Sequence, residues 1–218
     1  MASAWVTPEP EGIVRVVVCE EHALFRRGMI VALERDPHVE VVAELASADD
    51  LDSSDVTCDV VLLDITGSLR PIGETVAQVL RRLPLALVVL AVPDESDPAT
   101  YDALRHGAAG ILHKDIAIAT AAPALRAVQA GNVLLTTFLA TRVLAEYGEL
   151  APRARAGEDV PTLTEDEHRL LTLIADGSPA TAVAVAARLP AVTARNLVRN
   201  AVVKLQRQVA ADATVTSA

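Results

Sequence analysis

The feature that most constrains the fold is a series of short apolar runs separated by segments with helical spacing. Residues 14–19 (VRVVVC) and 60–64 (VVLLD) are almost entirely apolar, as expected for strands buried on both faces of a parallel sheet. Three further runs are expected to be strands: residues 39–43, 85–92 and 110–113. Segments with helical character follow these runs in turn: residues 22–35, 46–56, 73–82, 97–106 and 118–130. This alternation predicts an α/β fold with a five-stranded, doubly wound parallel sheet.

The rest of the chain lacks strand-like runs and predicts a small all-α domain. A helix is expected over residues 136–147, and residues 148–161 (GELAPRARAGEDVP) have the Gly, Pro and charge content of a linker. Three more helices are expected: residues 164–176, 179–187 and 191–210. The predicted division of the chain is a flexible leader, an α/β domain, a linker helix with a flexible linker, a helical domain and a frayed tail: residues 1–12, 13–131, 132–161, 162–210 and 211–218.

Composition excludes several classes of protein. No apolar stretch of 18 residues lacks charges, and the first twelve residues do not resemble a signal peptide, so we expect a cytoplasmic protein. The only cysteines are Cys19 and Cys58, which excludes a disulfide scaffold and favours buried thiols over metal ligands.

Charge divides the chain into two unlike parts. The net charge of −10 argues against nonspecific nucleic-acid binding by the whole chain. Residues 160–218, however, hold six basic and five acidic residues, a net charge of +1, so the acidic excess lies entirely in the first part. Two domains with different electrostatic roles are expected.

Charged side chains stand at several of the predicted strand ends. Glu20 and Glu21 follow the first strand, Asp64 ends the third, and Lys114 follows the fifth. Since the carboxyl ends of parallel strands share one edge of the sheet, these side chains should converge there. Three carboxylates suit a divalent cation such as Mg²⁺, and the lysine could balance a phosphoryl group. A solvated acidic rim is the alternative interpretation.

Longer stretches resemble a known family. Residues 14–130 resemble the receiver domain of bacterial response regulators, and residues 163–206 resemble the helix-turn-helix of the NarL/LuxR type. The resemblance is strongest in four stretches: VRVVVCEEHALFRRGM (14–29), DVVLLD (59–64), ALRHGAAGILHKD (103–115) and LTEDEHRLLTLIADG (163–177). It implies a transcription regulator of two-component phosphorelay systems, with Asp64 at the phospho-acceptor position.

The pocket departs from the family pattern at its metal pair and its loop. The acidic pair is Glu20-Glu21, whereas the family's pair usually ends in aspartate, and the extra methylene should weaken Mg²⁺ binding. Glu21 and Asp64 are the expected ligands of this weak Mg²⁺ site, and no cofactor is expected to be required. The loop after the acceptor, residues 65–69, lacks the family's proline.

Two further departures affect signalling. Ala91 occupies the position of the hydroxyl residue that contacts the phosphoryl group in the family, and Ile111 that of the aromatic switch residue. Of the usual machinery, only Asp64 and Lys114 match without change. Two hypotheses remain: Asp64 is phosphorylated with an altered response, or phosphorylation is lost and another signal controls the domain. We favour the second, since coupling requires different contacts in two states.

The resemblance places a recognition helix in the DNA major groove, with its N-terminal half toward the base edges. The residues expected there are Val192, Thr193, Arg195, Asn196 and Arg199. Lys204 lies further along, as a phosphate contact or a solvated charge. Pro190 stands where family members commonly have a Ser or Thr cap. The near-neutral domain should bind DNA weakly as a single copy, so a homodimer or a heterodimer with a related regulator is expected.

The sequence bears on three classes of function: a DNA-binding regulator, a protein-interaction partner and an enzyme. The leading hypothesis is a dimeric, DNA-binding regulator whose receiver-like domain senses a partner or ligand. Apolar residues near 97–106 and 110–113 suit dimer contacts or a small-molecule pocket. The alternatives are a conventional phosphorelay regulator or a protein-interaction partner that does not itself read DNA. An enzyme with Asp64 as nucleophile is disfavoured, because no Gly-rich phosphate loop is present. His22 is expected to start a helix rather than act as a catalytic group beside Glu21.

Overall fold

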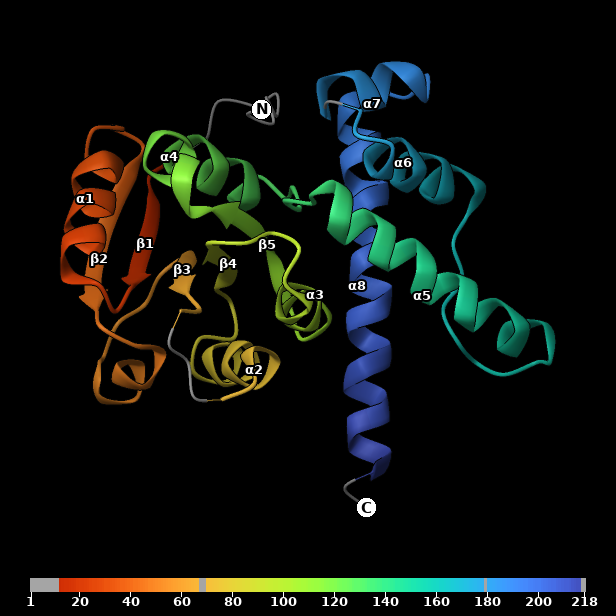
Figure 1. The fold of residues 1–218 in the computed structure, drawn as a ribbon, viewed down its shortest axis with the longest axis horizontal. Helices are drawn as coiled ribbons and strands as arrows, with labels where there is room; N and C mark the ends of the chain where they lie inside the picture. The colour runs from red at the N-terminus through yellow and green to blue at the C-terminus, as the bar shows by residue number, and fades with distance from the viewer. Residues whose placement is uncertain (1–11, 67–69, 179, 217–218) are drawn as a thin grey trace.

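A computed structural model describes residues 12–66, 70–178 and 180–216 (Figure 1). Residues 1–11 of the predicted leader, residues 67–69 of the loop at 65–69, residue 179 and the last two residues lie outside this part of the chain. An α/β domain occupies the first part, and helices make up the remainder. In the part of the chain that the structure describes, no helix is long and apolar enough to cross a membrane.

Five strands form one parallel sheet in the order β2-β1-β3-β4-β5. Their bounds are β1 Val14–Cys19, β2 Val39–Leu45, β3 Val60–Asp64, β4 Leu87–Val92 and β5 Ala108–His113. The predicted α/β class and the doubly wound sheet are confirmed. The two central strands β1 and β3 have the predicted ends, because apolar runs buried on both faces are the clearest strand signal.

Helices cover both faces of the sheet. Their bounds are α1 Ala23–Leu33, η1 Ala48–Ser53, α2 Ile72–Arg82, α3 Pro98–Arg105 and α4 Lys114–Gln129. Helices α1 and α4 pack on one face, and η1, α2 and α3 pack on the other. The expected helix over 46–56 is only a short 3-10 helix. Helix α4 begins directly after β5, earlier than expected, because the ring of His113 accepts a hydrogen bond from the backbone N–H of Asp115.

The linker helix α5, Thr137–Arg155, is longer than the sequence predicted, and it fills more than half of the expected linker at 148–161. Its buried stripe of Leu139, Val143, Tyr147 and Leu150 continues past Gly148 at helical spacing. Burial of this stripe therefore outweighs the cost of a glycine in the helix.

The helical domain consists of α6 Glu165–Ala175, α7 Ala180–Ala186 and α8 Ala191–Thr216. Helix α8 continues beyond the predicted end at residue 210, so the expected frayed tail is helical as far as Thr216. In Figure 1, α8 (blue) crosses α5, packs against α6 and runs past α3. One apolar cluster includes β3, α3, α5, α6 and α8 residues, so the two domains share a continuous core.

Candidate functional site

The strand ends bring three charged side chains together. Glu20 follows β1, Asp64 ends β3, and Lys114 begins α4 immediately after β5. The Lys114 ammonium lies 2.7 Å from Asp64 Oδ1 and 2.9 Å from Glu20 Oε2. Both carboxylate side chains are at least nine-tenths buried, with exposures of 2% and 4%. A buried cation thus bridges two buried anions, as the positions of the strand ends predict.

Hydrogen bonds hold Asp64 ionised. Burial raises its pKa, but hydrogen bonds from Lys114 and from the Thr66 backbone outweigh that effect, so the pKa lies below its usual value. The Thr66 N–H donates to Oδ1 at 2.8 Å. The other oxygen, Oδ2, is buried and has no hydrogen-bond partner among the described residues. An unsatisfied buried oxygen of this kind requires an explanation.

The structure places His22, and not Glu21, beside the carboxylates of Glu20 and Asp64. The side chain of Glu21 is exposed, so this expected metal ligand does not belong to the group of possible ligands formed by Glu20, His22 and Asp64. His22 is the N-cap residue of α1, as expected, but its side chain makes no cap. Its Nδ1 lies 3.2 Å from Glu20 Oε1 instead, and its backbone N–H donates to the same oxygen at 2.8 Å. No sequence signal separated this role of His22 from that of a helix start.

Small and apolar residues surround the acceptor position. Ala91 pairs in register with Asp64 on the neighbouring strand and is buried. A cavity of about 10 Å³ lies beside both residues, roughly the space for one water molecule. Ile111 is also buried and belongs to the main core cluster. The side chains of Ala91 and Ile111 therefore present no hydrogen-bonding group to this pocket.

The candidate DNA-reading residues lie on the first half of α8. Four of them are exposed: Val192, Thr193, Asn196 and Arg199. Arg195 is half-buried, and its Nη1 donates to the Ala130 carbonyl of the α/β domain at 3.2 Å. Arg199 lies beside Gly131, the residue after Ala130, since a Cβ added to Gly131 would lie 3.2 Å from Arg199 Nη1. The predicted shared face of the two arginines thus rests against the α/β domain.

Lys204 has a structural role in place of the expected phosphate contact or solvated charge. Its ammonium lies 2.7 Å from Glu167 Oε2 and donates to the Thr162 carbonyl at 3.1 Å. Glu167 is almost completely buried, and the capping box of α6 pairs it with Thr164. A buried carboxylate needs a counter-charge, which Lys204 supplies.

Two further side chains, Gln206 and Tyr147, also tie α8 to the rest of the molecule. The Gln206 amide donates to the carbonyls of Leu104 and Ala108, at 2.8 and 3.1 Å. The hydroxyl of the buried Tyr147 on α5 donates to the Ala201 carbonyl at 2.7 Å. Together with the Arg195 bond to Ala130, these contacts hold α8 against the α/β domain and α5 in this arrangement.

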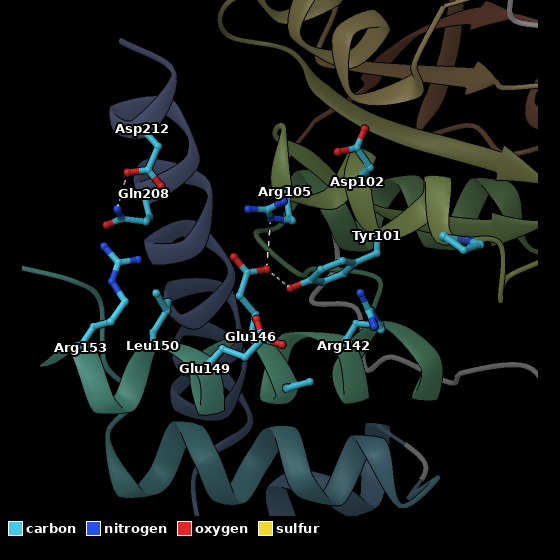
Figure 2. A pocket seen from close by; sticks show the side chains of 12 residues that line it. Tyr101, Asp102, Arg105, Arg142, Glu146, Glu149, Leu150, Arg153, Gln208 and Asp212 are labelled. Carbon is cyan, nitrogen blue, oxygen red and sulfur yellow. Dashed lines mark hydrogen bonds and ion pairs between the residues drawn. The ribbon is translucent and has the colours of Figure 1, made fainter. Parts of the chain in front are cut away.

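A polar cleft of about 540 Å³ lies where α3, α5 and α8 meet. Figure 2 shows Glu146 of α5 reaching the Tyr101 hydroxyl and Arg105, with which it forms an ion pair at 3.1 Å. Arg142 lies 5.2 Å from the centre of the Tyr101 ring. The apolar residues Tyr101, Ala103 and Leu104 of α3 are buried in the core cluster that also contains α5 and α8 residues.

Of the two cysteines, Cys19 lines the small cavity beside Asp64 and Ala91, and Cys58 precedes β3. Burial raises the pKa of the Cys19 thiol to about 12 and that of the Cys58 thiol to about 11. Both are free thiols, and both remain protonated at neutral pH. The interpretation as small, buried, unreactive side chains fits these values.

Comparisons with known proteins decide the family. No protein-family model matches the chain. The DNA-binding transcriptional activator DevR/DosR of Mycobacterium tuberculosis is 30% identical over 198 residues, which cover 88% of either chain. The probable transcriptional regulatory protein NarL of the same species is 34% identical over 181 residues, 81% of this chain and 80% of that protein. This chain belongs to the NarL/LuxR family of response regulators. It is therefore a DNA-binding transcriptional regulator with a receiver domain, and not an enzyme.

Solved structures agree with the fold. The RcsB response regulator of Salmonella typhimurium matches 89% of this chain and 92% of its own, with a TM-score of 0.53 and 20% identity. The receiver domain of the Mycobacterium tuberculosis NarL protein matches 56% of this chain and 99% of its own, with a TM-score of 0.50 and 31% identity.

Receiver domains bind Mg²⁺ at the acidic pocket, so the donors present here can be compared with that ion's needs. The group in this chain consists of Glu20, His22 and Asp64, whose ligand atoms all lie within 4.8 Å of one another. Mg²⁺ takes oxygen ligands in near-ideal octahedral geometry, whereas one donor here is an imidazole nitrogen. One oxygen of each carboxylate is already bound to Lys114. This donor set suits Mg²⁺ poorly.

Proposed function

We propose that this response regulator binds promoter DNA as a dimer and works with little or no dependence on phosphorylation of Asp64. Its receiver domain mediates dimerisation or senses a partner or ligand. The observation that carries the proposal is the surroundings of the acceptor: Asp64 faces the methyl group of Ala91 in register and is already bound by Lys114. As a reader of promoter DNA, the protein would act in the cytoplasm.

The physical reason lies in what phosphorylation would have to change. A transferred phosphoryl group needs donors that stabilise its charge, and a signal needs contacts that differ between two states. Ala91 offers no donor, and Ile111 is packed in the core without a polar atom on its side chain. A phosphoryl group on Asp64 would therefore have few contacts through which to shift the receiver between conformations.

Reading of DNA is assigned to the first half of α8. Arginine pairs with guanine and asparagine with adenine in the major groove, which suits Arg195, Arg199 and Asn196. Val192 and Thr193 would make the apolar and hydroxyl contacts at the start of the helix. Because residues 160–218 carry a net charge of only +1, one copy holds few phosphates, so two copies on paired half-sites supply the affinity.

The test compares the wild-type protein with Asp64→Asn. We expect both proteins to bind a native promoter fragment and to control a reporter gene equally. Little phosphoprotein should form during incubation with acetyl phosphate and Mg²⁺, whereas Ala91→Ser, which restores a hydroxyl, should form more. Stoichiometric phosphorylation of the wild type, with tighter DNA binding that Asp64→Asn abolishes, would restore a conventional phosphorelay role.

Two further measurements address DNA and dimerisation. The full chain should enrich specific fragments from its native genomic DNA, and sedimentation at tens of micromolar should show a dimer. Failure to enrich any fragment would favour the alternative of a partner protein that does not read DNA. A monomer that binds single half-sites tightly would contradict the dimer proposal.

A further inference from the structure

The acidic pocket contains a mixed set of metal-binding donors. Glu20, His22 and Asp64 each offer one ligand atom, and these atoms all lie within 4.8 Å of one another. Glu20 Oε1 and His22 Nδ1 are 3.2 Å apart. Two ligands bound at about 2.0–2.2 Å to one ion, at angles between octahedral and tetrahedral values, lie roughly 3.0–3.5 Å apart. The existing spacing of this oxygen and nitrogen fits one shared ion without rearrangement.

Only one oxygen of each carboxylate, Glu20 and Asp64, contacts Lys114. Lys114 lies within 2.9 Å of Asp64 Oδ1 and Glu20 Oε2. Two oxygens do not contact Lys114: Glu20 Oε1, which accepts the His22 backbone N–H and faces its ring, and Asp64 Oδ2, which is buried without a hydrogen-bond partner among the described residues. An ion bound to these two oxygens would give Asp64 Oδ2 its missing partner. It would also neutralise the negative charge that remains when one ammonium faces two carboxylates.

The donor types select the kind of ion. Imidazole nitrogen combined with carboxylate oxygen suits Zn²⁺ and its first-row neighbours, whereas Mg²⁺ favours an all-oxygen set. His22 is about three-fifths exposed, so its ring is accessible to an ion from solvent. Metal binding through Nδ1 requires the ring proton to sit on Nε2, a tautomer available to neutral histidine.

We propose that this chain binds a first-row transition metal ion, Zn²⁺ or Co²⁺, through Glu20, His22 and Asp64, in preference to Mg²⁺. Water molecules complete the coordination, because three protein ligands leave at least one position open. The proposal does not rest on the proposed function, since an ion bound to these side chains requires neither DNA nor a phosphoryl group. It identifies a ligand class that the receiver domain of this protein could sense.

The experiment titrates the full-length, metal-free protein with Co²⁺ and Zn²⁺. Visible absorption of bound Co²⁺ reports coordination, and equilibrium dialysis measures stoichiometry. We expect one ion per chain and no displacement by 10 mM Mg²⁺, roughly ten thousandfold above a micromolar metal concentration. His22→Ala should weaken binding at least about tenfold, since even outer-shell partners of metal ligands contribute 10–100-fold. Glu20→Gln should weaken it as well.

His38→Ala is the matched control, because His38 is exposed and lies outside the group. Its affinity for Co²⁺ should equal that of the wild type, and circular dichroism should show that every variant is folded. The proposal is overturned if millimolar Mg²⁺ displaces Co²⁺, if His22→Ala binds like the wild type, or if no ion binds at micromolar concentration. Equal losses in His22→Ala and His38→Ala would also overturn it, since they would indicate nonspecific binding to surface histidines.

Discussion

Replacement of Gln206 by alanine should tighten DNA binding, although Gln206 is not assigned a contact with DNA. Its side chain joins α8 to the receiver domain through the carbonyls of Leu104 and Ala108. These bonds exist only while the domains are docked, and in that arrangement Arg195 is held against Ala130. Loss of the bonds therefore destabilises the docked state alone and leaves the DNA-competent state unchanged.

The size of the effect follows from the two hydrogen bonds. Each contributes about 1 kcal/mol net, the usual value for an intramolecular hydrogen bond. A loss of about 1–2 kcal/mol corresponds to a roughly 5- to 30-fold larger population of separated domains. If the docked state predominates in the absence of DNA, the apparent dissociation constant for DNA should fall by the same factor.

Fluorescence anisotropy with a promoter fragment selected from genomic DNA would measure this change. Gln208→Ala is the matched control: Gln208 lies two positions further along α8, and its amide donates within the helix to Asp212 at 2.8 Å. Small-angle scattering should show a more extended Gln206→Ala protein and an unchanged Gln208→Ala protein. Equal DNA affinity for the wild type and Gln206→Ala would refute the argument that docking restrains α8.

Three further predictions concern stability and reactivity. Lys204→Met should lower the free energy of unfolding in urea by about 2 kcal/mol, less than for a fully buried pair because Lys204 is one-third exposed, while Arg207→Met on the exposed side changes little. The double variant Lys204→Met/Glu167→Gln should recover part of the lost free energy of unfolding, because it no longer buries an unpaired carboxylate. If it recovers nothing, the unpaired charge of Glu167 is not the cause of the loss. Cys19 and Cys58 should resist iodoacetamide at pH 8 until the protein is unfolded, because their raised pKa values leave about one thiolate in a thousand or fewer. The same shifts stabilise the fold below about pH 9, and this contribution is lost as the pH rises toward 11, which alkaline unfolding curves can follow.

The sheet was predictable because its signal is local. The run 60–64 is short and almost entirely apolar, as expected for a strand buried on both faces. A helix would show a longer pattern in which apolar and polar residues alternate with helical spacing. The extension of α5 was harder to predict, because Gly148 and Pro152 both argue for a break. The apolar spacing from Tyr147 to Leu150 was the signal that could have revealed the continued helix, since packing against the core outweighs propensity.

Contacts between residues far apart in the sequence account for the side-chain partners that the sequence did not predict. The meeting of Glu20, Asp64 and Lys114 follows from topology alone, because parallel strands end at one edge. The pairing of Lys204 with Glu167 joins two helices whose relative rotation no local pattern determines. The sequence predicts that His22 starts a helix, and His22 is indeed the N-cap residue of α1. The contact of its ring with the buried Glu20 carboxylate depends on tertiary structure and has no local sequence signal.

The two arginines on the recognition helix should respond differently to mutation, because only Arg195 has a hydrogen bond to the receiver domain among the contacts described. Arg199→Ala should cost about 1–3 kcal/mol of specific binding, the value of one base contact. Arg195→Ala should show a smaller net loss, since removal of its bond to Ala130 also releases the docked state by about 1 kcal/mol. In a Gln206→Ala background, where docking is already weakened, the loss from Arg195→Ala should grow toward that of Arg199→Ala. The same anisotropy assay measures all five proteins, the wild type included, and an Arg195→Ala loss that is identical in both backgrounds would show that its bond to Ala130 does not restrain DNA binding.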